Sequence, residues 1–330
     1  MAKRKLNTQQ TRRLSEKRTV KQEQEIDSSA KQTGKVITNF GKKVLVEVEH
    51  GKKIKCSIRQ NLGKLVAGDE VVWEQGLEAS TGIISQLKER TNLLSRPGFR
   101  GEMRMIAANI SLIGIVVPVV PGIHPDMIDR YLVASSQLGI PSFIILNKID
   151  LIVEQAHWEA IEEILQPYID LEIPIVQTSN LKNEQQRLQP RDALHAQLSD
   201  HVSVFVGASG AGKSSLINSL MPDLDIRIGE LSEATGLGSH TTSNSILYHL
   251  PSGGDLIDSP GIRQFTPEPC SLSELEQHFD DFEAFLGKCK FNNCTHTHEP
   301  DCEIIQAIDD GHISAQRLQS FHRLLQEFEA

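Results

Sequence analysis

One stretch of the sequence has residue types and spacing that suit phosphate chemistry. Residues 207–214 fit the pattern G-x-x-x-x-G-K-[ST], between an apolar run at 202–206 that predicts a buried strand and a helix predicted from Ser215. Glycines let backbone N–H groups curl around a phosphate, and the helix N-terminus adds partial positive charge. Lys213 would reach the β and γ phosphates, and Ser214 would ligate Mg²⁺. The pattern predicts nucleoside triphosphate binding by Gly207, Ala208, Ser209, Gly210, Ala211, Gly212, Lys213, Ser214 and Ser215.

A second motif predicts which base is bound. Asn147, Lys148, Ile149 and Asp150 match N-K-x-D directly after an apolar run, 142–146, that predicts a strand. The Asp150 carboxylate can accept two hydrogen bonds from guanine N1–H and its exocyclic amine, a donor pair that adenine lacks. Thr178-Ser179, after the next predicted strand, resembles the loop that supports the base, although Asn180 stands where alanine is usual. The expected ligand is therefore GTP rather than ATP.

A third motif supplies the remaining phosphate and magnesium contacts. Residues 258–261 match D-x-x-G, so Asp258 would bind Mg²⁺ through water and the Gly261 N–H would sense the γ phosphate. A second hydroxyl for Mg²⁺ would come from Thr241 or Thr242, and the sequence does not choose between them. The predicted magnesium set is thus Ser214, Thr241 or Thr242, and Asp258.

The catalytic water has no obvious partner in this sequence. Ile262 occupies the position after Gly261 where many GTPases carry a glutamine, and an apolar side chain cannot polarise water. We expect slow intrinsic hydrolysis, assisted by another group or by a partner. His240, beside the two threonines, is the candidate catalytic residue together with Lys213 and Gly261. A surface histidine without a catalytic role is equally compatible with the sequence.

The order of these motifs is itself informative. Conventional GTPases run from the phosphate loop through the switch threonine and D-x-x-G to N-K-x-D and the base loop. Here N-K-x-D and the base loop precede the phosphate loop, and D-x-x-G comes last. The order is that of a circular permutation, in which D-x-x-G leads directly into the C-terminal segment.

A cysteine cluster near the C-terminus predicts a metal site. Cys289, Cys294, His296 and Cys302 supply three thiolates and one imidazole, which suits tetrahedral Zn²⁺ in a closed structural site. His298 is the alternative fourth ligand, and reduced cysteines without metal are the alternative interpretation. A full Cys₃His set leaves no open position for water, which argues against catalytic zinc. Cys56 and Cys270 read as isolated small hydrophobic residues.

The predicted elements divide the chain into parts. Short strands from about residue 33 to 94, separated by glycine turns without intervening helices, favour a small OB-fold barrel. Residues 90–108 form a connector with little pattern. Alternating strands and helices from 109 onward predict a parallel, doubly wound α/β sheet, with each motif at the carboxyl end of a strand. Residues after 272 read as helices around the cysteine cluster, ending in an amphipathic stretch at 314–328.

Composition limits the class of protein. The 330-residue chain carries a net charge of −9, yet residues 1–21 hold eight Lys and Arg against one acid. Such an arm is expected to be disordered when free and attracted to nucleic acid, or else to act as a solubility tail. The sequence shows no apolar run long enough for a bilayer and no signal-peptide pattern, so we expect a cytoplasmic protein without membrane contact.

Permuted motifs, a preceding small barrel and a following Cys₃His segment together resemble the RsgA (YjeQ) family of bacterial small ribosomal subunit biogenesis GTPases. The resemblance covers nearly the whole chain past the basic arm. It implies an OB-fold, a permuted GTPase core and a zinc-bearing helical C-terminal domain. It also implies binding to a late small-subunit intermediate, GTP hydrolysis stimulated by the ribosome, and release afterwards. Its purine and phosphate contacts carry over to Asn147, Lys148, Asp150 and residues 207–215, and its zinc ligands to Cys289, Cys294, His296 and Cys302.

The combined expectation is a multidomain GTP hydrolase. It has a basic arm at 1–33, an OB-fold at 34–95, a permuted GTPase domain at 105–265 and a zinc-binding helical domain at 266–330. Its cofactors would be one structural Zn²⁺ and Mg²⁺ with GTP, its partners the small ribosomal subunit and its rRNA, and its state monomeric. An RNA-binding assembly scaffold in which GTP is only structural is the alternative. The sequence does not indicate which rRNA elements or ribosomal proteins are contacted, or how fast turnover is.

Overall fold

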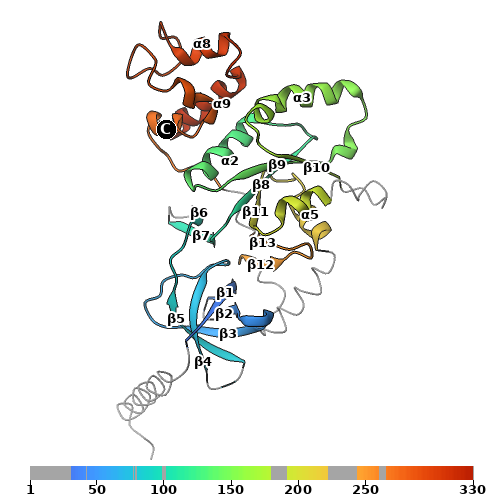
Figure 1. The fold of residues 1–330 in the computed structure, drawn as a ribbon, viewed down its shortest axis with the longest axis vertical. Helices are drawn as coiled ribbons and strands as arrows, with labels where there is room; N and C mark the ends of the chain where they lie inside the picture. The colour runs from blue at the N-terminus through green and yellow to red at the C-terminus, as the bar shows by residue number, and fades with distance from the viewer. Residues whose placement is uncertain are drawn as a thin grey trace, which may run out of the picture. The chain divides into compact units, whose positions relative to one another are not determined.

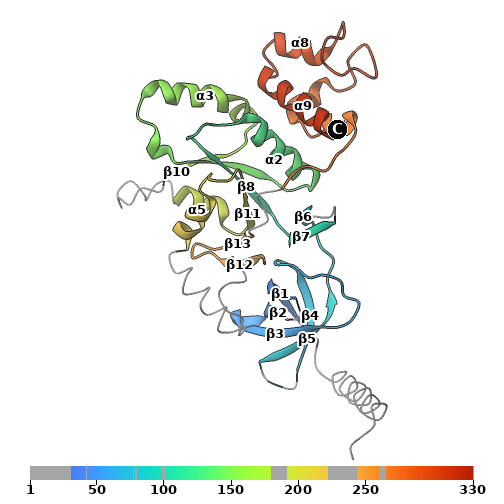
Figure 2. The same ribbon diagram turned by 180° about the vertical axis from the view of Figure 1, so that it is seen from behind.

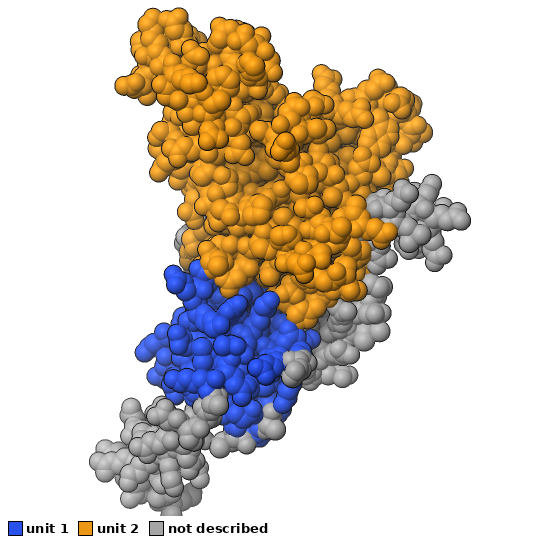
Figure 3. Space-filling model, viewed as in Figure 1, with its two compact units in different colours: residues 1–90 blue, residues 91–330 orange. Residues whose placement is uncertain are grey.

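A computed structural model describes residues 31–329, except 42, 77, 79, 99–101, 180–191, 222–243 and 260–264. The chain divides into two compact units, Met1–Arg90 and Thr91–Ala330, which are coloured separately in Figure 3. Among the residues described, no helix is both long and apolar enough to cross a membrane. Most of the predicted basic arm lies outside the described residues.

The first unit contains a closed five-stranded barrel (Figure 1). Neighbouring strands pair in the order β1-β2-β3-β5-β4, and β4 pairs back with β1. Its interior is filled by apolar side chains that alternate along the strands, among them Val36, Ile54 and Trp73. The strands are β1 (Gln32–Asn39), β2 (Val44–Glu47), β3 (Lys53–Ile58), β4 (Glu70–Gln75) and β5 (Thr81–Leu87), with the 3-10 turn η1 (Glu49–Gly51) between β2 and β3.

The second unit is built on a six-stranded sheet in the order β10-β9-β8-β11-β13-β12. Five of these strands are parallel, as predicted, and they are apolar because helices cover both faces. The exception is β12, which pairs antiparallel with β13, so the sheet is mixed rather than wholly parallel. The strands are β8 (Leu112–Pro118), β9 (Ser142–Asn147), β10 (Ile175–Thr178), β11 (Val202–Val206), β12 (Ile246–His249) and β13 (Asp255–Asp258).

Helices α2 (Pro125–Gln137) and α3 (Gln155–Asp170) lie on one side of this sheet and α5 (Lys213–Leu220) on the other (Figures 1 and 2). The reversal of strand order between β8 and β11 explains this, because crossovers that run in opposite directions fall on opposite faces. Helix α3 continues past the predicted end at Gln166 and through Pro167, and the buried Tyr168 anchors its last turn.

The connector that the sequence analysis left without pattern is a β-hairpin. Strands β6 (Leu93–Pro97) and β7 (Met103–Ala108) pair antiparallel, with a register shift between Leu94 and Ser95. That irregularity, together with arginines and glycines in place of regular alternation, explains why period-two reasoning missed it. The sequence analysis, which found little pattern in this connector, therefore missed the hairpin.

The C-terminal segment packs short helices around an aromatic core. Phe279, Phe282 and Phe321 are fully buried, and their ring centroids lie 5.1–5.4 Å apart. This core also receives Cys294 and Cys302, so the cysteine cluster is continuous with it. The elements are α7 (Leu272–Glu276), the 3-10 helix η4 (Asp280–Phe285), α8 (Glu303–Asp309) and α9 (Ala315–Glu329).

Candidate functional site

The phosphate loop lies between β11 and α5, in the strand–turn–helix context that its sequence predicts. Gly207, Gly210 and Gly212 have φ values of 140°, 80° and 101°, which side-chain-bearing residues rarely adopt. At Gly207 a Cβ would lie 2.4 Å from the Val116 carbonyl oxygen of the neighbouring strand β8. This glycine is thus required both by conformation and by close backbone approach.

The Lys213 side chain hydrogen-bonds to the backbone of the phosphate loop. Its ammonium donates hydrogen bonds to the Gly207 and Ala208 carbonyl oxygens, at 2.6 and 2.7 Å. Because Lys213 and Ser214 form the first turn of α5, their side chains stand where backbone N–H groups have no helical acceptor. The arrangement concentrates positive charge and donors at one point, which suits a phosphate group.

The N-K-x-D motif contacts the phosphate loop directly. The Asn147 side-chain amide is fully buried and donates to the Ala211 carbonyl oxygen at 2.8 Å. The Thr178 hydroxyl in turn donates to the Asn147 side-chain oxygen at 3.0 Å. Asn147 therefore joins the loop expected to hold phosphate to the strand ends expected to hold the base.

Asp150 is held in place by the second residue of the predicted base loop. The Ser179 hydroxyl donates to one Asp150 carboxylate oxygen at 2.8 Å. Lys148 lies beside it in the left-handed region with φ 65°, and its ammonium reaches the Val120 carbonyl oxygen at 3.5 Å. The carboxyl ends of neighbouring strands thus carry the Asp150 carboxylate and the Lys148 ammonium, together with the hydrogen-bond partners of both groups.

The magnesium set is only partly described. Asp258 ends β13, which pairs in parallel with β11, so its carboxylate stands at the same edge of the sheet as the phosphate loop. Its negative charge adds to the effect of burial in raising the pKa of Tyr248 on the adjacent strand. His240, Thr241, Thr242, Gly261 and Ile262 lie outside the described residues, as does Asn180.

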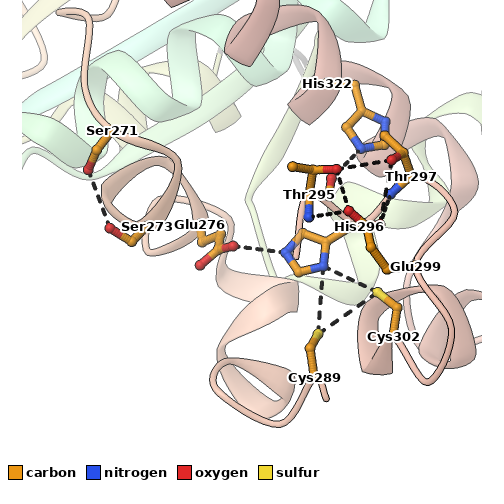
Figure 4. Close-up of polar contacts among 10 residues, drawn as sticks. All are labelled: Ser271, Ser273, Glu276, Cys289, Thr295, His296, Thr297, Glu299, Cys302 and His322. Carbon is orange, nitrogen blue, oxygen red and sulfur yellow. Dashed lines mark hydrogen bonds and ion pairs between the residues drawn. The ribbon is translucent and has the colours of Figure 1, made fainter. Parts of the chain in front are cut away.

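The structure brings the four predicted metal ligands together; Figure 4 shows three of them, Cys289, His296 and Cys302. The three thiol sulfurs and one imidazole nitrogen all lie within 4.8 Å of one another. Cys289 Sγ is 3.7 Å from His296 Nδ1 and 3.9 Å from Cys302 Sγ. Ligands on one tetrahedral zinc would be separated by about 3.5–3.8 Å, given bonds of about 2.0–2.3 Å. The two Cys289 distances lie close to this separation, so the four residues form a set that could hold a zinc ion.

Burial keeps two of the thiols protonated in the absence of a cation. Burial raises the pKa of Cys294 to about 12, and it raises the pKa of Cys302. A divalent cation bound at this point would stabilise the thiolates, which burial alone disfavours. His298, the alternative ligand, is exposed and hydrogen-bonds Thr297 instead of joining the cluster.

A carboxylate missed by the sequence analysis supports the cluster. Glu276 Oε1 lies 2.8 Å from His296 Nε2, the ring nitrogen that faces away from the sulfurs (Figure 4). Such a contact fixes the ring so that Nδ1 points at the metal position. Glu276 is twenty positions from His296, and no spacing rule connects a carboxylate to a ligand at that separation. His296 itself has φ 59°, a conformation imposed by the turn that aims it.

Comparison with known proteins gives consistent matches along the chain. Residues 87–268 match the family model described as RsgA GTPase. A Pseudomonas aeruginosa protein named small ribosomal subunit biogenesis GTPase RsgA is 43% identical, over 94% of this chain and 89% of its own. A protein of the same name from Ectopseudomonas mendocina is 42% identical, over 98% of both chains.

Two solved structures are similar to this fold throughout. YjeQ from Thermotoga maritima superposes with a TM-score of 0.74 at 28% identity, covering 91% of this chain and 99% of that one. YloQ, described as a circularly permuted GTPase, gives 0.71 at 27% identity, covering 91% and 96%. The expected multidomain architecture, with a barrel and a permuted GTPase core, is confirmed.

Proposed function

This chain belongs to the RsgA GTPase family, and we propose that it is a GTPase of small ribosomal subunit biogenesis whose turnover rises when it binds the subunit. The observation that carries this proposal is the Asn147–Ala211 hydrogen bond. It joins a guanine-reading motif to a phosphate loop although the two stand in reversed sequence order. A site assembled this way selects a guanine nucleotide and holds its phosphates at the helix N-terminus.

Each residue of the nucleotide site would have its own role in binding or hydrolysis. Asp150, oriented by Ser179, would accept the guanine donors, while Lys213 and the loop N–H groups would bind the phosphates. Mg²⁺ bound with GTP would be held by Ser214 and Asp258, together with Thr241 or Thr242, and would neutralise charge between the β and γ phosphates. The Gly261 N–H would report the γ phosphate, and His240 would assist the attacking water.

Zinc would have a structural role at Cys289, Cys294, His296 and Cys302. Four protein ligands leave no position for substrate, and the cluster lies within the aromatic core of the C-terminal segment. We propose that the segment at 266–330 folds around this ion. The OB-fold at 34–95 and the basic arm at 1–33 would provide the RNA-facing surface, and the protein would act as a cytoplasmic monomer.

The deciding experiment is steady-state GTP hydrolysis with and without purified small ribosomal subunits, with ATP as the control nucleotide. We expect slow hydrolysis of GTP alone, strong stimulation by subunits and no ATP turnover. Lys213→Ala should abolish both rates. Unstimulated hydrolysis with intact GTP binding, and equal subunit affinity in the GDP and non-hydrolysable GTP forms, would favour an assembly scaffold in which the nucleotide is structural.

A further inference from the structure

The loop between the first two metal ligands presents an aromatic ring to solvent. Phe291 lies at its tip and is 43% exposed, whereas three of the other five phenylalanines of this segment are buried. The Cys294 N–H donates to the Phe291 carbonyl oxygen at 3.2 Å, and the Lys290 N–H to the Asp301 carbonyl oxygen at 3.2 Å. With Cys289 and Cys294 both in the cluster, the backbone of the 289–294 loop is anchored at both ends.

The residues next to Phe291 in the chain carry ammonium and amide groups. The Lys290 ammonium stands 5.9 Å from the Phe291 ring centroid and pairs with Asp301 at 2.5 Å. Lys288 is exposed on the same loop approach, and within the described chain no carboxylate pairs with it. Asn292 and Asn293 are also exposed. An aromatic platform beside ammonium and amide groups is the combination that binds an unpaired nucleobase and its phosphate.

The net negative charge of the surrounding segment restricts which partners can bind at this loop. Residues 266–330 contain thirteen Asp and Glu but only four Lys and Arg. Of those four, Arg317 is buried between two aspartates and Arg323 pairs with Asp126. Among the residues described, Lys288 is therefore the one cation of this segment without a carboxylate partner, and Lys290 would exchange Asp301 for a phosphate. A long duplex would bring its phosphates against the acidic faces, whereas a single extruded base reaches the tip alone.

We propose that Phe291 stacks on an unpaired base of RNA, with Lys288 and Lys290 contacting the adjacent phosphates. The inference rests on the proposed function only in that the RNA would belong to the small subunit. The cluster of Cys289, Cys294, His296 and Cys302 then has a second consequence, because anchoring of the loop backbone lowers the ordering cost of stacking. A basic protein docking on the acidic faces is the competing occupant, and the experiment separates the two.

The first arm compares variants of the full chain for affinity toward purified small subunits. Phe291→Ala should weaken binding about 5- to 150-fold, the range for loss of one stacked base. Phe291→Tyr should bind like the parent, because it keeps the ring, and Phe291→Leu should bind like the alanine variant. A Leu variant that binds like the parent would indicate an apolar protein contact and overturn the proposal. Zinc content equal to the parent checks the fold of each variant.

The second arm uses no subunit, so its failure is separable from failure of the proposed function. Phe291→Trp places a fluorophore at the tip, and its signal is read against the parent with Trp73 and Trp158 as background. A single-stranded oligoribonucleotide should quench the variant more than the parent, whereas poly-lysine should not. Equal quenching at RNA concentrations that saturate binding by anisotropy would refute stacking. If the parent binds no subunits at all, the proposed function fails while this arm still decides the role of Phe291.

Discussion

Arg317 of α9 donates a 2.5 Å hydrogen bond to Asp129 of α2, and both side chains are almost completely buried, at 3% and 0% exposure. A second aspartate, Asp281, accepts from the other guanidinium nitrogens at 2.8 and 3.1 Å. The Phe279 ring lies 4.5 Å from the guanidinium carbon. The C-terminal segment is therefore joined to the GTPase core by a buried charge network as well as by the chain that follows D-x-x-G.

Removal of one partner from this network should be costly. Arg317→Met would leave Asp129 in a site where burial already raises the pKa of that carboxyl, against the opposing effect of Arg317. We expect a loss of about 3–5 kcal/mol in the free energy of unfolding, because the remaining charge is buried and unpaired. Urea unfolding followed by fluorescence measures this loss. Arg323→Met, at a half-exposed ion pair with Asp126, is the matched control and should cost less than about 1 kcal/mol.

The double variant Asp129→Leu with Arg317→Met tests whether the buried ion pair itself contributes to the free energy of unfolding. Apolar replacement of a buried ion pair is often neutral or stabilising, so most of the lost free energy should return. A double variant as unstable as the single one would show that Asp281 and Phe279 depend on the guanidinium itself.

The contact between Glu276 and His296 should tune metal affinity. Glu276→Gln weakens the support of the imidazole, and we expect zinc affinity to fall about 10- to 100-fold. Competition against a chromophoric chelator measures it. Cys302→Ser should lose far more, and Cys270→Ser, outside the cluster, should bind zinc like the parent. Equal affinity in the Glu276 variant and the parent would contradict a supporting role for that carboxylate.

The segment's contact with α2 should weaken in acid through His278. Burial lowers the pKa of His278, against the opposing charges of Asp280 and Glu274, and its ring hydrogen-bonds Ser136 at 2.9 Å. Because the folded-state pKa lies below the unfolded value of about 6.5, this stabilisation is present above about pH 6.5 and is lost as pH falls toward the folded-state value. The melting temperature of the parent should therefore fall more between pH 7.5 and 5.5 than that of His278→Gln. The exposed His157→Gln should behave like the parent.

The sequence predicted the GTPase core well because its chemistry is local. The motif residues follow strands directly, so each strand end could be placed without tertiary information, and the strand at 202–206 has the predicted bounds. Asn147 bonding to Ala211 was not predicted, since strand order in space determines that contact. Glu276 and the Arg317 network were missed for the same reason. The antiparallel β12 was missed because a four-residue strand carries no sign of its direction.

Alanine at Gly207 and alanine at Gly210, two glycines of the phosphate loop, should cost different amounts of stability, because only Gly207 approaches a neighbouring strand closely. Gly207→Ala places a Cβ 2.4 Å from the Val116 carbonyl oxygen, so the overlap should cost about 1–3 kcal/mol in addition to backbone strain. Gly210→Ala meets nothing within 4 Å and should cost only the left-handed strain, about 1 kcal/mol. Unfolding free energies without nucleotide measure both. Equal costs would mean that β8 moves away from the added Cβ at Val116. The close approach would then not require glycine at position 207.

Ser179 and Asp150 should have separable effects on nucleotide binding. Ser179→Ala removes the 2.8 Å hydrogen bond that orients the carboxylate, so GDP affinity should fall about tenfold or more, as for other hydrogen bonds to charged groups. The preference for guanine over xanthine should remain, since Asp150 still accepts the same donors. Asp150→Asn should instead shift that preference toward xanthine nucleotides, because the amide presents a donor to the base. Titrations with fluorescent GDP and XDP test both variants. If Ser179→Ala changes the preference, or Asp150→Asn leaves it unchanged, the assignment of guanine recognition to this carboxylate is wrong.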